Sequence, residues 1–322
     1  MTDLAQLVSQ LLAGRAPRIL YEVDLRPVSG SRFQPTGFPD LGAALFKDPK
    51  TGGDRLLVES PQSMANRLER VCWDDATNDV VAPLAGLPYV AVEGDVSTTS
   101  VLEAHRLNSP YVLADKAFEA TFKDHAGLGD GTVDRPKFAA ALLRFDPGSL
   151  VHGAFMSLIK PGTARLERML SSFIEAEQVE VVASGGVKVD RNDASGRDAG
   201  GSAEGFGNVP YHRNEYTAGR IFGSFSIDLA GIRGLRLPKQ GAELVVLLSL
   251  FKIRAFLDGS MRLRTACDFE FVDVVKTQPA DFALPDFDAV ANATQKAIAA
   301  CASNKLFASP STTKVTYSKK KA

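Results

Sequence analysis

The order of strand-like and helix-like patterns restricts the fold of this chain more than any other feature of its sequence. Residues 18–26 place Ile19, Tyr21 and Val23 at every second position, which indicates a strand. Residues 3–13 carry leucines at helical spacing, which indicates an amphipathic helix. Later strand-like runs are sometimes adjacent and sometimes separated by helices. This mixed order predicts an α+β fold rather than a regular alternation of strands and helices.

The same patterns assign most of the remaining chain. The predicted helices span 3–13, 100–107, 135–143, 164–175 and 286–300, and one more helix begins at Ser60. The predicted strands span 18–26, 55–59, 150–156, 179–189, 220–229 and 261–274. Residues 29–54 are rich in Gly, Pro and Asp and predict a long loop region. The segment 244–257 fits a helix by its length and a buried strand by its Val and Leu content, so both assignments stay open.

Composition excludes several classes of protein. The chain has 322 residues, of which 45% are hydrophobic and 23% charged, as in soluble globular proteins. Its net charge of −1 argues against a general polycation that coats nucleic acid, although a local basic groove is compatible with it. The longest apolar run, 244–251, is too short to span a membrane, and no secretory signal is visible. Three scattered cysteines fit reduced thiols, so we expect a cytoplasmic protein.

Motifs for cofactors, metals and nucleophilic catalysis are incomplete. The glycines at 127–131 lack the spacing and context of a dinucleotide-binding turn, and no P-loop occurs. Residues 130–134 resemble half of a calcium loop, but the other ligand positions are not acidic. The histidines and cysteines show no zinc-binding spacing, and no GxSxG motif is present. We therefore expect no metal ion and no cofactor.

The run 59–71 carries the most informative pattern. Ser60 suits a helix N-cap, and Pro61 suits the first helical position. Four polar side chains lie along one face of the predicted helix: Ser63, Asn66, Arg67 and Arg70. Hydroxyl, amide and guanidinium donors of this kind contact phosphates and sugars without reading base identity. An ordinary solvated helix face carries the same pattern, so both interpretations stay open.

Three further segments supply candidate nucleic-acid contacts. The run 98–111 contains His105, Arg106 and Asn108. A structural role for His105 is the first interpretation, and a contact of this run with phosphate or sugar is the second. The run 211–217 interleaves aromatic, basic and amide groups that suit an unpaired base and its phosphate: His212, Arg213, Asn214 and Tyr216. A turn with a tyrosine packed beneath it fits equally well.

The third segment, 184–208, holds seven glycines in 25 residues and the cations Lys188, Arg191 and Arg197. It fits a mobile surface loop or the tip of a long β-hairpin that becomes ordered on a partner. The basic C-terminal residues 302–322 predict a flexible tail.

Several segments resemble a known family. They are 36–44, 57–69, 101–110 and 214–216, and the similarity extends over about residues 18–300. The chain resembles the RAMP-superfamily backbone subunit of type I CRISPR surveillance (Cascade) complexes, in the variant called type I-U or I-G.

The resemblance implies one modified RRM-like (ferredoxin-like) palm over 1–322, with inserted finger elements and a β-hairpin thumb at 184–218. Family members are noncatalytic and stack head to tail in a helical filament along the guide crRNA. They hold its sugar-phosphate backbone and leave its bases free to pair with target DNA. The implied partners are guide crRNA, target DNA through the guide, further copies of the chain and other Cascade subunits, with no membrane.

Two alternatives remain at this point. One is a RAMP endoribonuclease that processes the guide precursor or cuts target RNA, for which His105 and His212 are the plausible bases and Asp40 a plausible loop carboxylate. The other is an unrelated α+β domain that shares only short motifs.

Overall fold

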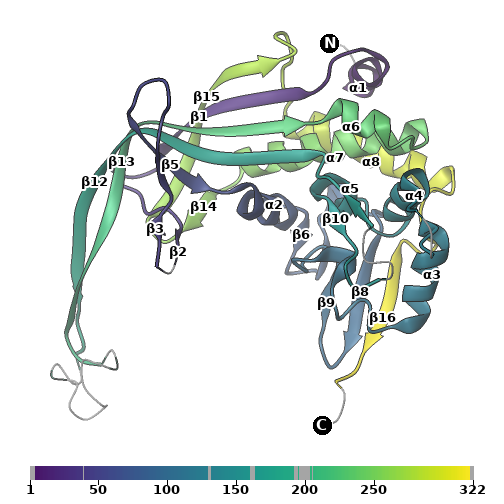
Figure 1. Cartoon of the computed structure of the whole chain (residues 1–322), viewed down its shortest axis with the longest axis horizontal. Coiled ribbons are helices and arrows are strands. Elements are labelled where there is room, and N and C mark those ends of the chain that lie inside the picture. The colour runs from purple at the N-terminus through teal and green to yellow at the C-terminus, as the bar shows by residue number, and fades with distance from the viewer. Residues whose placement is uncertain are drawn as a thin grey trace.

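A computed structural model describes residues 4–38, 40–129, 132–159, 164–191, 195, 204 and 206–319. Its centre is an antiparallel sheet of seven strands (Figure 1). In spatial order these are β14 (Met261–Arg264), β15 (Cys267–Gln278), β1 (Ile19–Pro27), β13 (Val209–Ile227), β12 (Leu170–Lys188), β5 (Asp54–Glu59) and β4 (Leu45–Lys47). The predicted α+β class is confirmed.

Strand β1 is an interior strand of the sheet, and its side chains alternate in polarity. Ile19, Tyr21 and Val23 are buried on one face, while Glu22 and Asp24 are half-buried on the other. The strand pairs with β13 on one side and with β15 on the other. Burial of the apolar face against helices stabilises this central position.

Local capping signals gave the starts of several helices correctly. Helix α2 (Pro61–Arg70) follows Ser60, whose Oγ accepts the backbone N–H of Ser63 at 3.2 Å. The helices predicted at 3–13, 135–143 and 286–300 are confirmed as α1 (Leu4–Ala13), α4 (Arg135–Phe145) and α8 (Phe287–Ser303).

The open segment 244–257 belongs to helix α7 (Lys239–Asp258). This helix packs against β13 and β15 of the sheet, and also against α1, α2 and α8. Since it is covered on several sides, nearly all its residues from Leu244 to Leu257 are buried, including the polar Ser249 and Lys252. The amphipathic period that would have revealed a helix is therefore absent.

Several predicted elements are wrong. Residues 100–107 form turns and lead into a short 3-10 helix, η2 (Arg106–Asn108), instead of an α-helix. Residues 164–175, predicted as a helix, form β11 (Arg165–Leu166) and the start of β12. There Leu170, Ser172 and Ile174 are buried at every second position, so the strand period prevails over the helical spacing.

Two predicted strands also differ. Residues 150–156 are divided between the end of helix α5 (Gly148–His152) and the two-residue strand β10 (Ala154–Phe155). The single strand expected at 261–274 is the hairpin of β14 and β15, because Ala266 adopts a left-handed backbone (φ 56°) and turns the chain.

A second unit lies below the main sheet in Figure 1. It contains a three-stranded sheet and a helix that the sequence patterns missed, α3 (Lys116–Ala126). The remaining short elements are β2 (Gly37–Phe38), β3 (Gly42–Ala43), β6 (Trp73–Asp74), β7 (Asp79–Val80), η1 (Ala82–Leu84), β8 (Tyr89–Gly94), β9 (Thr98–Thr99), α6 (Leu229–Gly234) and β16 (Thr312–Tyr317).

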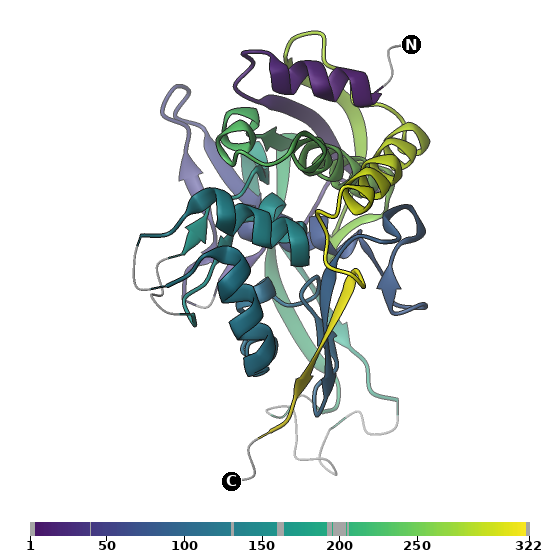
Figure 2. The same cartoon turned by 90° about the vertical axis from the view of Figure 1, so that its right-hand side faces the viewer.

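The interpretation of 302–322 as a flexible tail is wrong for much of this segment. Strand β16 pairs in parallel with β8 along its whole length (Figure 2), and Val315 is buried. Four of the five residues in 312–316 are β-branched, and they supply the strand propensity that the lysine-rich composition obscured.

Strands β12 and β13 form a hairpin much longer than the sheet. The two strands pair with each other from Leu170 opposite Ile227 to Lys188 opposite Val209. Strand β5 pairs with β12 only as far as Glu177, and strand β1 pairs with β13 only between Ile227 and Ile221. The outer half of the hairpin therefore extends away from the sheet and curves down along one side of the molecule (Figure 1).

A buried carboxylate joins the edge of the sheet to α2. The Glu59 side chain is fully buried and accepts hydrogen bonds from Ser63 Oγ, from Arg67 Nη2 at 2.8 Å and from Arg264 Nη2.

We predict that Glu59→Gln lowers the free energy of unfolding by about 3 kcal/mol, because two cations lose their counter-charge. Urea denaturation measures the change. Glu93→Gln, which removes an exposed partner of Lys314, is the control and should change stability little; equal effects of the two substitutions would contradict the prediction.

Candidate nucleic-acid interface

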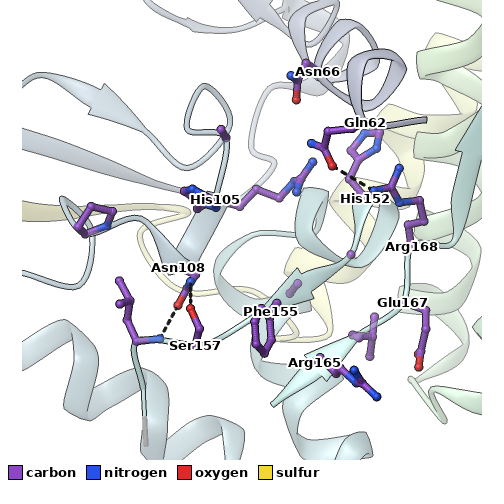
Figure 3. Close-up of a pocket in the computed structure, with 17 residues that line it drawn as sticks. Gln62, Asn66, His105, Asn108, His152, Phe155, Ser157, Arg165, Glu167 and Arg168 are labelled. Carbon is purple, nitrogen blue, oxygen red and sulfur yellow. Dashed lines mark hydrogen bonds between the residues drawn. The ribbon is translucent and has the colours of Figure 1, made fainter. Parts of the chain in front are cut away.

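Helix α2 separates two surface cavities. The larger has a volume of about 1220 Å³ and lies between α2, the segment 104–110 and the strands β10 and β11 (Figure 3). The smaller has a volume of about 490 Å³ and lies between α2, the end of α7 and β14. Asn66 lines both cavities, so one face of the predicted binding helix is accessible from two sides.

Polar and cationic groups line the larger cavity. The guanidinium of Arg168 donates to the Pro61 carbonyl oxygen at 2.8 Å and to Gln62 Oε1 at 3.2 Å. Burial lowers the pKa of Arg168, and the nearby Arg106 guanidinium lowers it further. Arg165 is exposed on the opposite wall, where the ring of Phe155 is also 54% exposed (Figure 3). The cavity thus combines donors with an apolar surface.

A buried ionic network lies behind this cavity. Glu69 accepts two hydrogen bonds from the Arg106 guanidinium, one of them 2.9 Å long. Burial raises the pKa of Glu69, and Arg106 opposes that change. Burial also raises the pKa of Asp146, which accepts a hydrogen bond from Ser149 Oγ at 2.9 Å. The network continues to Lys252, which is 2% exposed.

Lys252 Nζ lies 2.9 Å from Nε2 of His152, a residue that lines the larger cavity. Burial, and then the positive charges of Lys252, Arg106 and Arg168, hold the pKa of His152 well below its ordinary value. The imidazole is therefore neutral at physiological pH.

Some predicted contact residues meet around α2. Asn66 and His105 are exposed in the larger cavity, and Ser63, Arg67 and Arg70 line the smaller one. The Arg70 side chain is 53% exposed and pairs with the equally accessible Asp75.

Other predicted contact residues have structural partners instead. Arg67 is bound to buried Glu59 and to the Leu263 carbonyl oxygen, and Arg106 is bound to Glu69. Asn108 is 8% exposed; its amide donates to Ser157 Oγ at 2.9 Å and accepts from the backbone N–H of Leu158 at 3.1 Å. These hydrogen bonds occupy the groups that were predicted to bind phosphate or sugar.

The remaining candidates lie on the β12–β13 hairpin, apart from α2. Tyr216 is only 6% exposed and forms a backbone bridge with Phe33, so its ring offers no free face for a base. Arg213 Nε donates to the buried carboxylate of Glu215 at 2.9 Å. The exposed candidates are Lys188, Arg191, His212 and Asn214. Arg197 lies outside the described residues.

The sequence patterns missed Gln62, His152, Phe155, Arg165 and Arg168. Four of these lie in segments whose elements were predicted incorrectly, 150–156 and 164–175. The chain brings them to α2 over about a hundred residues of separation, and no local motif signals that contact.

The described ranges contain neither a grouped metal-ligand set nor a membrane-spanning helix. Among those residues, no three His, Cys, Asp or Glu side chains are grouped as metal ligands. The three cysteines are free and buried, and burial raises the pKa of the Cys267 thiol to about 11. No helix in the described ranges is both long and apolar enough to cross a membrane.

Comparison with known proteins identifies the class of protein and then its family. Residues 19–181, just over half of the chain, match a family of CRISPR-associated proteins. The chain belongs to this family, which is described as CRISPR-associated protein GSU0053.

No curated protein matches the sequence. One solved structure, a "CRISPR RNA-guided surveillance complex, pre-nicking", is 13% identical with a TM-score of 0.38, covering 78% of this chain and 76% of that one. A likeness this weak carries no argument about the site.

The depressed pKa of His152 makes stability depend on pH. Below pH ~6.5 the unfolded chain binds a proton at this residue that the native protein does not, so acidification favours unfolding by up to about 1.4 kcal/mol per pH unit. In His152→Gln the glutamine amide oxygen can still accept from Lys252, but the side chain does not titrate. We predict that this variant lacks the contribution of His152 to the pH dependence of the free energy of unfolding. Urea denaturation of both proteins between pH ~7 and pH ~5 checks it. Parallel stability curves for the two proteins would contradict the assignment.

Proposed function

We propose that this protein is a noncatalytic backbone subunit of a type I Cascade complex, of the type I-U or I-G variant, that binds guide crRNA. Membership of a CRISPR-associated family is the observation that carries this proposal. The cavities on both sides of α2, with Asn66, Arg70, His105 and Arg165 accessible in them, support α2 as the floor of the guide groove. Donors of these types hold a sugar-phosphate backbone without reading sequence.

The order of strands supports an RRM-like palm. Strands β15, β1, β13 and β12 are neighbours in the sheet, and in chain order β1, α2, β12, β13, α7 and β15 follow the βαββαβ pattern of ferredoxin-like folds. The segment 71–169 is inserted between α2 and β12, and we assign it to the finger elements of the proposed palm.

The long β12–β13 hairpin is the proposed thumb. Its outer half leaves the sheet and exposes the cations Lys188 and Arg191 together with His212. In this proposal the hairpin inserts between guide nucleotides, while the remaining bases stay free to pair with target DNA.

Assembly completes the proposal. Copies of the chain stack head to tail along the guide and contact other Cascade subunits. A net charge of −1 suits such stacking, because strongly basic copies would repel one another. We place the complex in the cytoplasm, where both guide and target are found.

We propose no catalytic role, and the positions of the candidate bases support this. His105 lies in the larger cavity, His212 lies on the hairpin, and Asp40 lies on an exposed turn between β2 and β3. Within the described residues, His105 has no carboxylate partner that would orient it as a general base.

Guide binding through α2 is testable with the pair Arg70→Ala and Arg165→Ala. We expect weaker binding to every single-stranded RNA sequence. The slope of the logarithm of the binding constant against the logarithm of salt concentration should become shallower by about 0.7 for each lost phosphate contact. Fluorescence anisotropy with labelled RNAs at several salt concentrations measures both quantities.

Lys239→Ala, an exposed cation at the start of α7, is the matched control and should leave binding unchanged. A loss confined to particular RNA sequences would contradict backbone recognition. RNA recovered after incubation should be intact, and its cleavage would favour the endoribonuclease alternative.

The thumb assignment is tested by shortening the hairpin. Lys188 and Val209 are paired, so a two-residue Asn-Gly turn can replace residues 189–208 without breaking the ladder. We expect this variant to unfold at the same temperature as the full chain but to form fewer large particles on RNA, as measured by size exclusion with light scattering. Unchanged assembly would refute the thumb assignment, and an unfolded monomer would show that the segment is needed for folding.

A further inference from the structure

His152 lines the larger cavity, and one of its two ring nitrogens has no hydrogen-bond partner among the described residues. His152 is 3% exposed, and its Nδ1 atom is buried without a hydrogen bond. The other ring nitrogen, Nε2, faces the Lys252 ammonium group, which can only donate. Nε2 must therefore accept, and the neutral ring carries its proton on Nδ1. Lys252 thus fixes a tautomer that presents an unused N–H donor.

The charges around this donor favour an anion. Two carboxylates, Glu69 and Asp146, face three cations, Arg106, Lys252 and Arg168, so the cluster has one positive charge in excess. An unpaired donor beside buried cations costs free energy that an anionic oxygen would recover.

The rest of the cavity suits more than an isolated ion. Gln62 accepts from Arg168 through Oε1, which leaves its amide N–H₂ group as a further donor. The Phe155 ring is exposed on the facing wall, and nucleobases stack on such rings (Figure 3). The volume of about 1220 Å³ exceeds that of typical small-molecule sites, about 300–1000 Å³.

We propose that this cavity binds the phosphate group of one nucleotide, held by the His152 Nδ1–H group and the Arg168 guanidinium, with its base against Phe155. Lys252 is the positioning residue, because it fixes the histidine tautomer. The phosphate belongs either to a strand of RNA or to a free nucleotide. The RNA source rests on the proposed function, whereas the free nucleotide does not.

The first test needs no substitution. The full-length protein labelled with ¹⁵N is titrated with uridine monophosphate, with uridine and with a short oligouridylate, and the histidine ring nitrogens are followed by NMR. We expect the His152 Nδ1–H resonance to move with the monophosphate, the oligonucleotide or both, and to stay unchanged with uridine. The absence of any movement with phosphate-bearing probes overturns the proposal.

The second test compares two substitutions of the same residue. His152→Gln retains an acceptor for Lys252 but lacks a donor at the Nδ1 position, whereas His152→Asn places an amide donor there. If RNA is the source, His152→Gln should weaken binding roughly ten- to a hundredfold, as for a lost hydrogen bond to a charged group, and His152→Asn should recover much of it. His125→Gln, at an exposed histidine of α3, is the control and should bind normally.

The outcomes separate this site from the proposed function. Normal RNA binding by His152→Gln, together with a His152 shift on uridine monophosphate, assigns the site to a free nucleotide. If the wild-type protein binds no RNA, the guide-binding proposal fails, and the monophosphate titration alone then decides the site. If RNA binds but His152 responds to no phosphate-bearing probe, the site is refuted and the guide-binding proposal stands.

Discussion

The position of helix α2 depends on buried carboxylates, above all on Glu59. Glu59 ends strand β5 and receives hydrogen bonds from Ser63 and Arg67 of α2 and from Arg264 of β14. A fully buried charge is tolerated only when it is paired and hydrogen-bonded, so these residues have little freedom to move. Because α2 forms a wall of both cavities, this one interaction defines the shape of the candidate interface.

The opposite side of α2 is held in a similar way. Glu69 binds Arg106, and the network behind that pair extends to Lys252 and His152. Guanidinium groups used in these pairs hold the chain together and are not available to nucleic acid. The cations that remain accessible, such as Arg70 and Arg165, lie at the rims of the cavities. A near-neutral protein can therefore present local positive charge, because much of its charge is neutralised internally.

The candidate site was predictable only in part. The Ser60 cap and the polar face of α2 are local patterns, and they correctly located Asn66 and Arg70 at an accessible surface. Arg67 carries the same pattern but points to a carboxylate that is also bound by Arg264, about two hundred residues away. The sequence left Tyr216 open between stacking on a base and packing inside the protein, and the structure shows it buried beside Phe33. Burial of this kind depends on distant segments, which a local pattern does not contain.

Local patterns were sufficient for β1, α2, α4 and α8, because period and capping act within a few residues. They were insufficient for α7, which is apolar on nearly all sides, and for β16, whose strand character depends on its pairing with β8. They also could not reveal His152, whose role depends on Lys252 one hundred residues further along the chain. Hydrogen bonds and charges between remote segments are fixed only when the chain is folded, so the chemistry of the larger cavity is a property of the tertiary structure alone.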